Sequence, residues 1–122
     1  MKQMKVTREL ERGQIAMVDF GEFNGSVQGG LRPCIIISNN LANRHSGVII
    51  CVPMTSNTQK RVIPTHALIE PCDKDNCLKR ASVALCEQIT TIAKDSIKCI
   101  TGKLSSHDCE RVDKCIKVSL AL

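Results

Sequence analysis

The chain has 122 residues, of which 43% are hydrophobic and 24% are charged, and it carries a formal net charge of +5. This composition excludes intrinsic disorder and fits a single domain over residues 1–122. The positive charge favours a polyanionic partner, whether nucleic acid, an acidic protein or an anionic membrane surface. Because Phe20 and Phe23 are the only aromatic residues, a nucleic-acid site built on a broad stacking platform is also excluded.

The predicted elements of the first half are short strands separated by polar loops. A helical turn is expected from Thr7 to Arg12, and strands are expected at residues 15–20, 32–38 and 47–52. Glycine-rich and polar segments at 21–30, 41–47 and 57–61 predict loops or turns between them.

The second half continues this pattern and ends in a helix. Strand segments are expected at 62–63 and 67–69, on either side of Pro64, which marks an edge or bulge. Further strand segments are expected at 81–92, interrupted by Glu87-Gln88, and at 97–104. A charged turn is expected at 73–79, and Ser105 is the expected cap of a helix with one apolar stripe. The fold class is therefore mainly β with short helices (α+β), a small β-barrel with a C-terminal helix.

Eight cysteines raise the question of disulfides or a metal site. The basic N-terminus is not followed by the apolar core of a signal peptide, and no apolar segment is long enough to cross a bilayer. We therefore expect a cytoplasmic protein whose cysteines are reduced and serve mostly as small core residues. Because neither Cys72–Cys77 nor Cys109–Cys115 has CxxC spacing, no metal or other cofactor is expected.

Two strand ends carry the residues of a candidate anion site. Arg32 follows a glycine-rich loop and precedes the apolar run that begins after Pro33, so its guanidinium is held at the end of a sheet. Thr55 and Ser56 follow the apolar strand at 48–52, and they place hydroxyls at a second strand end. Arginine and hydroxyls at one rim of a small sheet suit a phosphodiester.

Several motifs then occur in a specific order: GSVQGGLRP (25–33), Asn43-Arg44, VPMTS (52–56), Pro64-Thr65-His66 and EQITTI (87–92). Together they resemble the MazF/PemK/Kid family of ribosome-independent mRNA interferases, the toxins of type II toxin–antitoxin pairs. The similarity runs from Arg12-Gly13 to the C-terminal helix. It implies an SH3-like barrel, a homodimer and a cognate MazE-type antitoxin. It also implies metal-independent cleavage of single-stranded RNA at short specific sequences, leaving a 2′,3′-cyclic phosphate and a 5′-hydroxyl.

The resemblance also implies roles for individual residues. Arg32 and Thr55 match the catalytic arginine and threonine of the family, and Ser26 is the third catalytic candidate. Among the RNA-binding candidates, Gln28, Asn43 and Arg44 match family positions in the substrate loop or beside the RNA groove. The others are suggested by the residues alone: Ser56 as a hydroxyl at a strand end, and Lys60 and Arg61 as an exposed basic loop. Val27 stands where the family has a glutamate, and this removes a carboxylate from the expected site. Neither His45 nor Glu22, the general bases considered, falls on a family motif.

Two other functions remain as alternatives. A non-catalytic RNA-binding barrel is suggested by Val27. A topoisomerase poison of the CcdB kind shares the expected fold, but that family acts through C-terminal residues that include tryptophan, and this chain has none.

Overall fold

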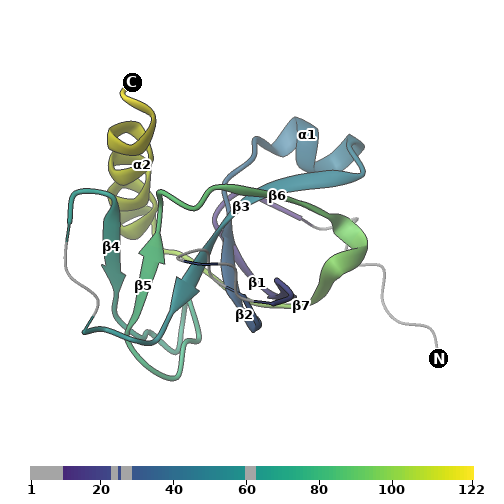
Figure 1. Ribbon diagram of the computed structural model, residues 1–122. Coiled ribbons are helices and arrows are strands. Elements are labelled where there is room, and N and C mark those ends of the chain that lie inside the picture. Colours follow the sequence, from purple (N-terminus) through teal and green to yellow (C-terminus); the bar gives the residue numbers. More distant parts are fainter. Residues whose placement is uncertain (1–9, 23–24, 26–28, 60–62) are drawn as a thin grey trace.

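The computed structural model describes residues 10–22, 25, 29–59 and 63–122. Within them, seven strands form one curled antiparallel sheet, and a long C-terminal helix stands beside it (Figure 1). The strands are β1 (Gln14–Asp19), β2 (Leu31–Ile36), β3 (Val48–Thr55), β4 (His66–Ile69), β5 (Ser82–Leu85), β6 (Thr90–Ala93) and β7 (Ile97–Lys103). The helices are α1 (Asn40–His45), the 3₁₀ helix η2 (Lys94–Ser96) and α2 (Ser106–Leu120).

Strand β3 is the centre of the sheet. The strand order is β4-β5-β3-β2-β1-β7, and β6 also pairs with β3. On one side β3 pairs with β2, and on the other it pairs first with β6 through residues 48–51 and then with β5 through Met54 and Thr55. Since no pairing joins β4 to β7 among the described residues, the sheet is open. The predicted mainly β fold with a C-terminal helix is confirmed, and the term barrel describes its curvature and not a closed ring.

Both faces of the central strands are buried. On β2, Ile35 belongs to a core cluster that includes Val112 of α2, whereas Cys34 and Ile36 belong to a second cluster with Val18 of β1. This alternation follows from the two-residue period of a strand. It explains why the run from Cys34 to Ile37 is continuously apolar and not amphipathic.

Most predicted boundaries agree with the structure. The interruption at Glu87-Gln88 separates β5 from β6, and the Ser105 hydroxyl caps α2 by accepting a hydrogen bond from the Asp108 amide at 3.1 Å. The segment predicted as a polar loop at 41–47 instead contains α1, because the Asn39 side chain caps it by accepting from the Ala42 amide at 2.8 Å. Of the turn expected at Thr7–Arg12, only residues 10–12 are described, and these are not helical.

Two long-range contacts close the fold. Arg12 donates to the Asp113 carboxylate at 2.8 Å, 101 positions further along the chain, and to the Ile37 carbonyl at the same distance. The turn at 72–77 rests against β7, where the Asp75 carbonyl accepts from the Lys103 amide at 3.0 Å. The Gly102 backbone lies so close to this turn that a Cβ there would be 2.6 Å from the carbonyl carbon of Asn76.

The cysteines divide between core and surface. Cys34, Cys51 and Cys86 are fully buried, and Cys109 and Cys115 pack against the core, whereas Cys77 and Cys99 are exposed. The pKa of Cys86 is raised to about 12, mainly because the thiol is buried and to a lesser extent because the Cys115 thiol lies nearby. In the part of the chain that is described, no helix has both the length and the apolar character needed to span a membrane.

Candidate active site

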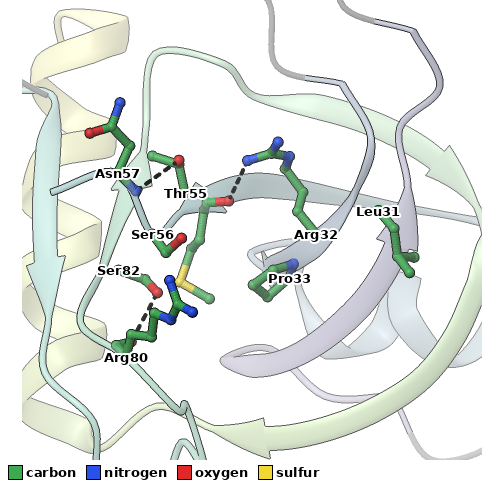
Figure 2. Close-up of a pocket in the computed structure, with 9 residues that line it drawn as sticks. Leu31, Arg32, Pro33, Thr55, Ser56, Asn57, Arg80 and Ser82 are labelled. Carbon is green, nitrogen blue, oxygen red and sulfur yellow. Dashed lines mark hydrogen bonds between the residues drawn. The ribbon is translucent and has the colours of Figure 1, made fainter.

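Antiparallel pairing brings the two principal candidates together. Arg32 is the second residue of β2 and Thr55 is the last residue of β3, and these neighbouring strands run in opposite directions. The beginning of one strand therefore lies beside the end of the other. One guanidinium nitrogen of Arg32, Nη1, donates to the carbonyl of Met54 at 3.2 Å, and Met54 directly precedes Thr55 (Figure 2).

The Arg32 side chain is held from both sides of the strand end. Its Nε donates to the Gly29 carbonyl at 2.7 Å, and Nη1 bridges to β3 as described above. The loop that carries Gly29 is closed at its base, because the Gly30 amide donates a hydrogen bond to the Gly21 carbonyl at 2.6 Å. Gly30 has a φ of 83°, which a residue with a side chain rarely adopts. Partial burial lowers the pKa of Arg32 from its usual value, but an arginine remains charged in a protein.

The Thr55 hydroxyl is oriented by the turn that follows β3. Its Oγ1 accepts a hydrogen bond from the Asn57 amide at 3.2 Å, and the residue is only 8% exposed. Since the oxygen acts as acceptor toward the backbone, its own hydrogen can be donated to a ligand.

A cavity of about 480 Å³ opens at these strand ends. Its described lining consists of Leu31, Arg32, Pro33, Met54, Thr55, Ser56, Asn57, Arg80 and Ser82. Two arginines and three side-chain hydroxyls thus surround the space, and the described lining contains no carboxylate. An anion is the ligand that this electrostatic arrangement favours.

Arg80 is a cavity residue that the sequence analysis missed. It precedes β5 and points into the cavity from the side opposite Arg32 (Figure 2). The Ser82 hydroxyl donates to the Arg80 carbonyl at 3.1 Å and so holds the backbone at this position. The sequence does contain a signal that could have identified Arg80, because it is a basic residue that precedes an apolar strand segment, as Arg32 is.

The remaining predicted site residues lie in different parts of the chain. Ser56 lines the cavity and is exposed. Ser26, Gln28, Lys60 and Arg61 lie outside the described residues. Arg44 and the considered base His45 are exposed on α1, which precedes β3 and so lies at the end of that strand opposite Thr55. Glu22, the other base considered, is exposed just beyond β1 and does not line the cavity.

The expectation for Asn43 is corrected. This residue of α1 is fully buried, so its side chain is not accessible to RNA. Its amide donates to the Ser38 carbonyl at 2.8 Å, and its carbonyl accepts from the Ser38 hydroxyl. Asn43 therefore stabilises the connection between β2 and β3 instead of forming part of the binding surface.

Comparisons with known proteins identify relatives of this chain. The family model of the PemK-like, MazF-like toxins of type II toxin–antitoxin systems matches residues 11–120. The chain is 36% identical to endoribonuclease EndoA of Bacillus subtilis strain 168 over 113 residues, which cover 93% of this chain and 96% of EndoA.

Solved structures show the same fold. An endoribonuclease from a mycobacterial species, in complex with its cognate antitoxin, superposes with a TM-score of 0.76 at 26% identity, covering 93% of this chain and 96% of that one. MazF of Deinococcus radiodurans superposes with a TM-score of 0.76 at 19% identity, covering 93% of this chain and 97% of its own. The chain belongs to the family of PemK-like, MazF-like toxins of type II toxin–antitoxin systems.

Proposed function

We propose that this protein is an endoribonuclease that cleaves single-stranded RNA at the cavity between Arg32 and Thr55. The observation that carries the proposal is the convergence of these two side chains at neighbouring strand ends, in a cavity whose described lining has no carboxylate. The 36% identity with an endoribonuclease over nearly the whole chain supports it.

The proposed reaction uses the 2′-hydroxyl of the RNA as its nucleophile. Its oxygen attacks the adjacent phosphorus, and the bond from phosphorus to the 5′-oxygen of the next nucleotide breaks. The products are a 2′,3′-cyclic phosphate and a 5′-hydroxyl, after the nucleophile loses one proton to solvent water and the leaving oxygen takes one proton from it. Negative charge grows on the phosphoryl oxygens during this exchange, and stabilising it is the task for which the cavity is suited.

Arg32 and Thr55 divide this task. The Arg32 guanidinium presents several donors in a plane, which matches two phosphoryl oxygens at once. Thr55 donates its hydroxyl hydrogen from a position fixed by the Asn57 amide. Because the described lining contains neither an imidazole nor a carboxylate, the proposed acceleration comes from positioning and charge stabilisation by these donors, without a metal ion.

The proposal includes the partners expected for a toxin of this kind. The protein acts in the cytoplasm as a homodimer, and a cognate antitoxin inhibits it by covering the cationic cavity with an acidic, extended segment. Folding of such a segment on binding allows it to cover a large surface. A mycobacterial endoribonuclease has been solved with its cognate antitoxin, which supports this part of the proposal.

The test is cleavage of a labelled single-stranded RNA by the purified protein in EDTA, followed by analysis of the new ends. We expect fragments with a 5′-hydroxyl and a 2′,3′-cyclic phosphate. Arg32→Ala should lower kcat by at least about 10²–10³, the usual effect of removing one preorganised donor. Arg32→Lys should also be slow, because an ammonium lacks the planar fork. Lys114→Ala removes an exposed positive charge from α2 and serves as the control.

Three outcomes would contradict the proposal. Full activity of Arg32→Ala would show that this cavity is not the active site. Binding of RNA without cleavage by the wild-type protein would favour a non-catalytic RNA-binding barrel. Cleavage that stops in EDTA and returns with a divalent cation would refute the metal-independent mechanism. Thermal unfolding of each variant separates loss of function from loss of fold, since Arg32 also bonds to Gly29 and Met54.

A further inference from the structure

A second cavity, of about 410 Å³, adjoins the first. The two share Pro33, Ser56, Arg80 and Ser82, so Arg80 stands on the boundary between them. The remaining described lining of the second cavity consists of Met17, Cys77, Leu78, Lys79 and Thr101. The cavity therefore extends from the end of β3 across β2 and β1 to β7, and the turn that precedes β5 closes one side.

The chemistry of this second cavity differs from that of the first. Met17, Pro33 and Leu78 provide an apolar floor, and Met17 and Pro33 are direct cross-strand neighbours on β1 and β2. The rim carries the side chains of Lys79 and Arg80, both exposed, together with hydroxyl groups. Its volume lies within the 300–1,000 Å³ typical of small-ligand pockets. An apolar floor with polar groups at the edge suits a flat ring that has apolar faces and a polar edge.

We propose that the second cavity holds the base of a nucleotide adjoining the cleaved phosphodiester, with a preference for uracil or guanine. This inference rests on the proposed function, since it requires the scissile phosphate to lie in the first cavity. The sugar–phosphate chain then crosses the boundary beside Arg80. The Arg80 guanidinium can contact the base from there, as arginine planes stack on unpaired bases in RNA complexes.

The base preference follows from the donors at the rim. Lys79 and Arg80 can only donate hydrogen bonds, and the described lining has no carboxylate that could accept from an exocyclic amine. Uracil and guanine present a carbonyl oxygen beside a ring N–H on their Watson–Crick edge, whereas cytosine and adenine present an exocyclic amine beside an unprotonated ring nitrogen there. Lysine or arginine commonly bonds guanine at O6 and N7. The Ser82 hydroxyl already donates to the Arg80 carbonyl, so its oxygen remains as an acceptor for a ring N–H.

The experiment uses RNA oligonucleotides centred on the mapped cleavage site, each lacking one base. For the wild-type protein, removal of the base that occupies the second cavity should lower kcat/KM by about 5–150-fold, the range that corresponds to losing one good set of base contacts. Thr101→Trp fills this cavity from an exposed position on β7 that does not line the first cavity. It should lower kcat/KM on the intact RNA by a similar factor. On the RNA lacking that one base, the variant and the wild type should agree within about twofold.

Two further variants make the result specific. Thr91→Trp introduces the same side chain at an exposed threonine of β6 that lines neither cavity, and it should leave all rates unchanged. Lys79→Gln removes a rim cation without filling the space. It should reduce the preference for uracil or guanine over adenine or cytosine at the same position. Thermal unfolding under the same conditions verifies that each variant is folded.

The outcomes separate the two proposals. If the wild type cleaves no RNA, the proposed function fails and the base subsite fails with it. If the wild type cleaves and Thr101→Trp lowers the rate equally on all RNAs, or on none, the second cavity is not a base subsite and the proposed function stands. An unchanged base preference in Lys79→Gln would overturn the assignment of uracil or guanine.

Discussion

Replacement of Gly102 by alanine tests the contact on which the turn at 72–77 rests. An added Cβ would lie 2.6 Å from the Asn76 carbonyl carbon, 2.8 Å from the Asp75 oxygen and closer still to the Asn76 oxygen. These are backbone atoms, so no side-chain rotation relieves the overlap. The Asp75 carbonyl also bonds to the Lys103 amide, and moving the turn would lengthen that bond.

The expected loss for Gly102→Ala is about 2–3 kcal/mol of unfolding free energy, the upper part of the range for overpacked positions. In a domain of this size, this corresponds to a fall in Tm of about 5–15 °C. Gly47→Ala is the matched control, because a Cβ there meets no atom within 4 Å and its φ is not in the left-handed region. Thermal and urea unfolding, followed by circular dichroism, measure both variants. Equal melting temperatures of the two variants would show that the close packing of Gly102 against the turn does not limit stability.

Three further predictions concern the site, the core and the corrected residue. Thr55→Val keeps the shape of the side chain and should lower kcat for RNA cleavage by about 10²–10³. Thr55→Ser keeps the hydroxyl and should retain most activity. Equal activities of the two variants would show that the hydroxyl has no part in the mechanism. Burial holds Cys86 as a neutral thiol in the folded state, so the contribution of Cys86 to stability should be constant below about pH 9 and should be lost as the pH rises toward 12, where the folded thiol ionises. Urea unfolding with a reductant should show this fall, and Cys86→Ala should reduce it. Asn43→Ala should cost about 2–3 kcal/mol by leaving Ser38 groups without their partner, and the folded variant should bind RNA as tightly as the wild type in an anisotropy titration.

The strand pattern of the sheet was accessible from the sequence because burial leaves a direct signature there. The continuous apolar run from Cys34 to Ile37 predicts a strand covered on both faces, and the structure confirms it through two separate core clusters. The position of Arg32 at a strand end follows from the same run together with Pro33. Its proximity to the end of β3 follows from the antiparallel pairing of the two strands.

The features that the sequence did not predict depend on tertiary contacts. Asn43 is polar and lies in a polar segment, so its complete burial depends on the hydrogen bonds to Ser38 and not on its own character. Arg80 enters the cavity because β5 pairs with the end of β3, which is a contact between segments far apart in the chain. The helix at Asn40–His45 is short, and a single capping side chain decides whether such a segment is helical.

The pairing of β1 with β7 has a consequence for how the protein is made. The first described strand finds one of its two neighbours only near the end of the chain, and the Arg12–Asp113 ion pair joins positions 101 residues apart. Contacts of such long range slow folding, because closing the long intervening loop costs conformational entropy before the contacts stabilise the fold. A nascent chain therefore cannot complete the sheet until β7 has been synthesised. We expect refolding on the millisecond-to-second scale typical of β proteins with mainly non-local contacts.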